Sequence, residues 1–167
     1  MYNKKVLDHF RKPHNFGKMK NPDGMGKVGN IVCGDVMHLY IKVGKPAIGW
    51  SASGRKNSEQ IITDVKFKTF GCVAAIATSS MITDLAKGKI LQKALRIDKN
   101  AVIKSLGSLP PVKIHCSVLA ADALAEAIYD YLKKNNKEIS LDLKKRHKRI
   151  RKEKEIIEEK FKGWTNG

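Results

Sequence analysis

The chain has 167 residues, a length that suits one domain, since single domains usually run from about 50 to 250 residues. Hydrophobic residues make up 42% of it, enough for a core, which excludes disorder throughout. The net charge of +17 attracts nucleic acids, anionic membranes and acidic proteins alike, so charge alone selects no partner.

The cysteine count and the N-terminal residues point to a reducing compartment. Three cysteines cannot all pair within one chain, which favours free, catalytic or metal-binding thiols. The first residues contain no apolar stretch typical of a secretory signal, and no apolar run reaches about 18 residues. We therefore expect a cytoplasmic protein without membrane association.

The first part of the chain predicts one helix and two strands. Residues 3–11 have the apolar spacing of a short amphipathic helix, with Asn3 as its N-cap. Glycines and prolines over residues 13–30 predict a loop. Side chains alternate between apolar and polar over 35–43 and again over 61–68, which predicts two strands joined by a long hairpin loop over 44–60.

The second part is predicted to be mainly helical. A helix is expected over 73–87, followed by one or two short helices between 91 and 106. Two adjacent prolines should keep Leu109–Lys113 extended. A long helix is expected over 117–134, and a charged one over 138–162.

The composition changes near the C-terminus, and we predict a domain over residues 1–134 with a basic, helical extension over 135–167. Residues 133–162 contain 13 basic and 6 acidic residues. Aromatic residues are only 7% of the chain and are not interleaved with the basic ones, which disfavours nucleic-acid binding. Mixed charges at helical spacing instead favour a solvated or protein-docking helix.

The cysteines fall at the ends of predicted elements. Cys72 and Cys116 should open helices, where the helix dipole favours a thiolate. Cys33, Cys72 and Cys116 are 39 and 44 positions apart, too far for a zinc-finger knuckle, so any shared site would join three separate loops. Asp35 and His115 would add an oxygen and a nitrogen donor.

Several interpretations of these residues remain open. Isolated cysteines are more often small buried hydrophobes than ligands, so spacing alone favours a structural role over metal binding or nucleophilic catalysis. If they are ligands, their types suit iron, zinc or an iron–sulfur cluster. Surface or packing roles are predicted for the other histidines, which are His9, His14, His38 and His147.

Three motifs follow one another along the chain: Cys-Gly-Asp-Val-Met at 33–37, Phe-Lys-Thr-Phe-Gly-Cys at 67–72, and Leu-Pro-Pro-Val-Lys-Ile-His-Cys-Ser at 109–117. Their order and length resemble the signatures of the IscU/NifU-type iron–sulfur scaffold family. The similarity covers roughly residues 2–134 apart from the hairpin loop, and it favours the metal-site interpretation.

This resemblance implies an α+β fold, in which a small antiparallel sheet of about three strands is packed on one side by helices. The basic C-terminal helix would be an addition. The resemblance further implies a scaffold or carrier rather than an enzyme. It would accept sulfur from a cysteine desulfurase, take up iron, assemble a transient 2Fe-2S cluster and transfer it to ferredoxin and other apo-proteins.

The resemblance also assigns residues. The metal ligands would be Cys33, Asp35, Cys72, His115 and Cys116. Among these, Asp35 would be an exchangeable ligand and His115 an alternative one, with zinc as a possible resting occupant. A DnaK-type chaperone and its J-protein cochaperone would bind the segment Leu109, Pro110, Pro111, Val112 and Lys113.

The sequence departs from the family pattern in three places. Val73 replaces a usual glycine, the loop over 44–60 is longer, and the chain beyond Lys134 is added. The alternative function is that of a zinc-bound, SufU-like sulfurtransferase partner of a cysteine desulfurase. Such proteins usually lack a counterpart of His115 and of the 109–113 segment, so these residues favour the cluster scaffold.

Overall fold

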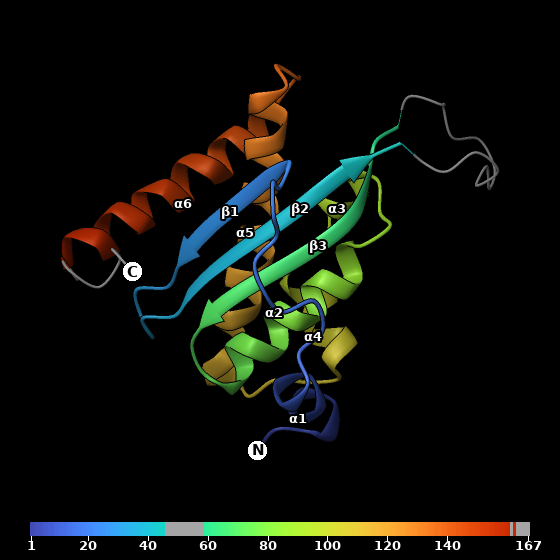
Figure 1. Ribbon diagram of the computed structural model, residues 1–167. Helices are drawn as coiled ribbons and strands as arrows, with labels where there is room; N and C mark the ends of the chain where they lie inside the picture. The colour runs from blue at the N-terminus through green and yellow to red at the C-terminus, as the bar shows by residue number, and fades with distance from the viewer. Residues whose placement is uncertain (46–58, 161, 163–167) are drawn as a thin grey trace.

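A computed structural model describes residues 1–45, 59–160 and 162 (Figure 1). Most of the hairpin loop predicted over 44–60 therefore lies outside the described residues. The described chain contains one antiparallel sheet in the order β1 (Gly24–Gly29), β2 (Val36–Gly44) and β3 (Ile61–Phe70). The predicted three-stranded antiparallel sheet is confirmed, and β2 and β3 lie where side-chain alternation placed them.

Strand β1 was not located by the sequence, which predicted a loop over 13–30. Its glycines are there because helix α5 (Ile114–Lys134) lies directly on this strand. A Cβ atom at Gly24 or Gly26 would collide with main-chain atoms of α5. Glycine normally weakens a strand, but it is also the residue that permits close approach of another backbone.

Helices cover one face of the sheet, as the resemblance implied (Figure 1). Helices α5 and α2 (Val73–Ala86) lie against the strands, and α1 (Lys4–Arg11) packs on α2. Asn3 caps α1 as predicted, because its side chain accepts a hydrogen bond from the Val6 N–H. The two short helices are α3 (Leu91–Ala94) and α4 (Lys99–Leu106).

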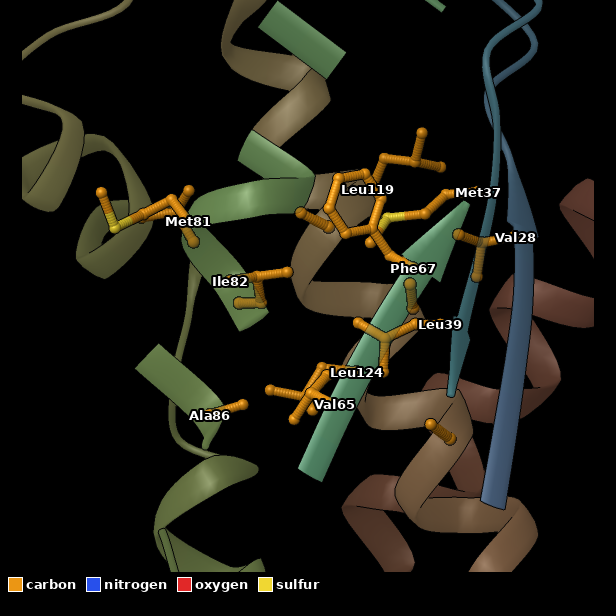
Figure 2. Close-up of a cluster of buried hydrophobic side chains, with 14 of the residues drawn as sticks. Val28, Met37, Leu39, Val65, Phe67, Met81, Ile82, Ala86, Leu119 and Leu124 are labelled. Carbon is orange, nitrogen blue, oxygen red and sulfur yellow. The ribbon is translucent and has the colours of Figure 1, made fainter. Parts of the chain in front are cut away.

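The core lies between the sheet and these helices (Figure 2). Leu39 and Phe67 point from the sheet toward Ile82 of α2 and Leu124 of α5, and all four side chains are buried. Burying side chains of this size stabilises the fold by about 1.5–3 kcal/mol each relative to exposure. This core fixes the positions of the loops at the ends of the strands.

The segment before α5 differs from the prediction. Pro111–Lys113 form a short 3-10 turn, η1, and α5 begins at Ile114 rather than at residue 117. The prediction was wrong because proline is tolerated at the first position of a helical turn, where its missing N–H costs nothing. As a result, His115 and Cys116 lie in the first turn of α5.

The predicted charged C-terminal helix is present as α6 (Leu141–Lys160), which packs against α5 and β1 (Figure 1). Leu143, Ile150 and Ile157 are buried at seven-residue spacing, so they share one face of the helix. Arg146 and Arg149 both donate hydrogen bonds to the buried carboxylate of Asp122 in α5. The division of the chain at residue 134 remains a prediction.

A second, half-buried carboxylate on α5, that of Glu126, also faces α6. The Nδ1 atom of His147 lies 2.8 Å from a carboxylate oxygen of Glu126, and the His147 ring stacks on Tyr129 at a centroid distance of 3.7 Å.

Among the described residues, no helix is both long and apolar enough to cross a membrane.

Candidate metal centre

Three connections between elements meet at one end of the sheet. The turn between β1 and β2 carries Cys33 and Asp35, Cys72 lies between β3 and α2, and the first turn of α5 carries His115 and Cys116. We call these residues the five-donor centre. All three cysteines are free thiols.

The most regular part of the centre is a triangle of Asp35, Cys72 and Cys116. The two sulfur atoms are 3.8 Å apart, and Oδ2 of Asp35 lies 3.9 Å from Cys72 Sγ and 3.8 Å from Cys116 Sγ. Thiolates bound tetrahedrally to a metal at about 2.3 Å are separated by roughly 3.8 Å. The triangle therefore already has the size of one face of a tetrahedral metal site.

Cys33, Asp35 and His115 form a second group, with one donor atom from each residue lying within 4.8 Å of the others. Asp35 belongs to both groups, so the two groups join into one centre. The Nε2 atom of His115 is buried and has no hydrogen-bond partner among the described residues. An unpaired buried polar atom is costly, and a bound metal would satisfy it.

Burial keeps two of the thiols protonated in the metal-free chain. Burial and then the adjacent Asp35 raise the pKa of Cys33 to about 11. Burial also raises the pKa of Cys116, with a further contribution from Cys72. The expectation that the helix dipole favours a thiolate at Cys116 is therefore wrong for this state. A bound metal cation would stabilise the thiolate forms of both cysteines and so lower their pKa values.

The side chain of Cys72 lies near the positively charged side chain of Lys113. The charge of Cys72 is the main cause of the raised pKa of Lys113, so the two groups attract one another. The pKa of Tyr2 is also raised, first by burial and then by the charge of Cys72. Neither Tyr2 nor the contact between Lys113 and the centre was predicted, because both depend on distant parts of the chain meeting.

Gly71 is a further residue whose role the sequence did not indicate, although it belongs to the motif at 67–72. A Cβ atom there would lie 2.7 Å from Oδ1 of Asp35 and 2.8 Å from Cβ of Ala75. Asp35 is buried and has little space in which to move. Gly71 thus leaves the room that the Asp35 carboxylate occupies beside Cys72.

The fold and the centre define a small α+β protein with a thiol-rich site suited to metal. Residues 1–138 match the family model described as the NifU-like N terminal domain. The chain therefore belongs to this family, and the resemblance inferred from the three motifs is confirmed. Helix α6 lies beyond the matched residues.

Curated relatives agree with this assignment. The chain is 53% identical over 137 residues to the iron–sulfur cluster assembly scaffold protein IscU 1 of Archaeoglobus fulgidus, covering 82% of this chain and 80% of the relative. It is 45% identical over 136 residues to the scaffold protein IscU of Aquifex aeolicus, covering 81% of this chain and 79% of that one.

A solved structure supports the fold. The N-terminal NifU-like protein of Brucella abortus has a TM-score of 0.56 and 21% sequence identity, covering 79% of this chain and 94% of that one. Together with the observed sheet and helices, this similarity confirms the predicted α+β fold with an added C-terminal helix.

Replacing Gly71 by Ala should weaken metal binding at the five-donor centre. The new methyl group would push the Asp35 carboxylate away from Cys72 and Cys116. We expect at least about a 10-fold loss of Co²⁺ affinity, the effect typical of displacing groups that position ligands. Anaerobic titration followed by visible absorption measures it.

Gly44→Ala is the matched control, because its Cβ would meet only the side chain of Thr63 at the opposite end of β2. Equal Co²⁺ affinity in the Gly71→Ala and unaltered chains would show that Asp35 does not contribute to the site.

Proposed function

We propose that this chain is a scaffold on which a transient 2Fe-2S cluster is assembled and from which it is transferred to apo-proteins. The observation that carries the proposal is the convergence of three separate connections into the five-donor centre. The relatives named as assembly scaffolds support it. The cluster would be cargo, so the chain would act as a carrier rather than as an enzyme.

The donor types of the centre suit this cargo. A cysteine desulfurase would pass sulfane sulfur to a thiol of the centre, and two electrons from an external donor would reduce each sulfur to sulfide. Thiolates and an imidazole bind iron well, whereas the carboxylate of Asp35 is a harder donor that exchanges more easily. Such a mixed set of ligands favours a cluster that can be released.

Exposed apolar side chains surround the centre and support docking of protein partners there. Val32 precedes Cys33, Phe70 closes β3 and Val112 lies in η1; their exposed fractions are 84%, 75% and 75%. Exposed large hydrophobes grouped around a functional site are typical of interaction surfaces. The desulfurase and the apo-protein acceptors, ferredoxin among them, would approach the centre across these residues.

The segment Leu109–Lys113 would bind the DnaK-type chaperone and its J-protein. Its two prolines restrict the backbone, so less conformational entropy is lost when the segment enters a groove. Val112 is exposed, and Leu109 anchors the segment to the core. Because η1 leads directly into the first turn of α5, pulling on this segment would disturb His115 and Cys116 and so favour cluster release.

The alternative function is a zinc-bound partner that raises desulfurase turnover without building a cluster. The specific observation in its favour is the Asp35–Cys72–Cys116 triangle, whose 3.8–3.9 Å edges suit tetrahedral zinc as well as iron.

Anaerobic reconstitution with iron, cysteine, a reductant and a cysteine desulfurase tests the proposal. The scaffold function predicts a coloured product with iron and sulfide in equal amounts per chain. Cys72→Ser should abolish this product, because Cys72 is the donor that the connection between β3 and α2 contributes to the centre. His38→Asn, on the outer side of the sheet, is the matched control and should leave it unchanged.

Unchanged iron and sulfide content in Cys72→Ser would contradict the shared site. A colourless chain that retains zinc tightly and accelerates the desulfurase would instead establish the alternative function.

Asp35→Ala should make the assembled cluster longer-lived and its transfer slower. Removing the exchangeable oxygen donor leaves ligands that release iron less readily. The measurement is the rate of cluster transfer to apo-ferredoxin, followed by circular dichroism in the visible range. Transfer at an unchanged or increased rate would show that Asp35 does not keep the cluster labile.

A further inference from the structure

A second group of side chains with metal-ligating atoms close together lies outside the five-donor centre. His9 near the end of α1, His14 in the following loop and Asp84 near the end of α2 each offer one donor atom, and these atoms lie within 4.8 Å of one another. We call these residues the His9–His14–Asp84 cluster.

The cluster is distinct from the five-donor centre. Helix α2 begins just after Cys72, and Asp84 lies 12 positions further along the chain. At 1.5 Å per residue, this separates the two along the helix by about 18 Å. The two sites could therefore be occupied and emptied independently.

His9 is held in place within the cluster. Its side chain is buried, and its Nδ1 atom lies 2.8 Å from Oγ of Ser80 in α2. The backbone N–H of His14 donates to the same Oγ atom, also at 2.8 Å. Ser80 thereby fixes the positions of both histidines relative to α2, in the way that outer groups orient metal-binding imidazoles.

The other two members have the freedom to close around an ion. The side chains of His14 and Asp84 are 55% and 35% exposed, and His14 Nδ1 lies 2.6 Å from Asp84 Oδ2. The two imidazole rings are 4.6 Å apart between centroids. Nitrogen and oxygen ligands about 2.0–2.1 Å from a tetrahedral metal are separated by roughly 3.3 Å. Small rotations of the exposed side chains would reach that spacing.

The charge environment favours a transition metal over calcium or magnesium. Two of the three donors are imidazoles, and that of His9 is buried against α2. The adjoining surface hollow is lined by Lys5, Arg11 and Lys12 and by a single carboxylate, Asp8, which is paired with Lys4. The excess of positive charge there disfavours ions that bind by electrostatic attraction to carboxylates alone. A site with one carboxylate in such surroundings would bind hard ions poorly, whereas two imidazoles suit Zn²⁺ and its neighbours in the series.

We propose that the His9–His14–Asp84 cluster is a second metal site, which takes a divalent transition-metal ion such as Zn²⁺ through two imidazoles and one carboxylate. The ion would displace the proton that His14 and Asp84 share, which would pass to solvent. A water molecule would occupy the fourth coordination position of the ion. It would join α1, the loop after it and α2, and so hold the N-terminal helix against the fold.

The test uses the full chain with Cys33, Cys72 and Cys116 replaced by Ser, which removes the thiols of the other centre. Titration with Co²⁺ should show about one ion per chain, with the weak visible bands of nitrogen and oxygen ligands and without thiolate charge-transfer absorption. Adding His14→Asn should lower the affinity at least about 10-fold. Adding His38→Asn, the matched control, should leave it unchanged.

Absence of Co²⁺ binding in a chain that retains its far-ultraviolet circular dichroism would overturn the proposal, as would equal affinity with His14→Asn. If the cysteine-free chain does not fold, zinc stoichiometry in the otherwise unaltered chain decides the question. The second site predicts that His14→Asn removes about one zinc ion per chain while Co²⁺–thiolate absorption persists. An unchanged zinc content would reject the site whether or not the chain assembles clusters.

Discussion

The close contact between α5 and β1 determines how the rest of the molecule is arranged. Gly24 and Gly26 have no side chain on the face where α5 lies, so the helix backbone approaches the strand directly. This contact places the first turn of α5 at the same end of the sheet as the turn between β1 and β2. Cys116 consequently meets Asp35, although 81 positions separate them in sequence.

The structure holds the donors of the candidate centre together at a cost. The buried Nε2 atom of His115, which has no partner among the described residues, costs free energy in the metal-free chain, and the raised pKa values of Cys33 and Cys116 disfavour their thiolate forms. Burial of the surrounding core stabilises it nevertheless. Unpaired polar atoms and perturbed pKa values of this kind are typical of functional sites, and a bound metal cation would satisfy these donors.

Sequence patterns predicted those features that depend on neighbouring residues. Alternation located β2 and β3, and the three motifs identified the five donors as candidates. Strand β1 was missed because its glycines serve a contact with helix residues about 100 positions away. The His9–His14–Asp84 cluster was missed for a similar reason, since Asp84 is 70 positions from His14 and no local pattern joins them.

We propose that sulfur, oxygen and nitrogen donors from three connections bind one metal together. Zinc X-ray absorption spectroscopy on the chain with one equivalent of Zn²⁺, in the His14→Asn background, measures this most directly. The structure predicts a mixed shell with two or more sulfur atoms at about 2.3 Å and lighter donors at about 2.0–2.1 Å. A shell of nitrogen and oxygen alone would contradict the claim.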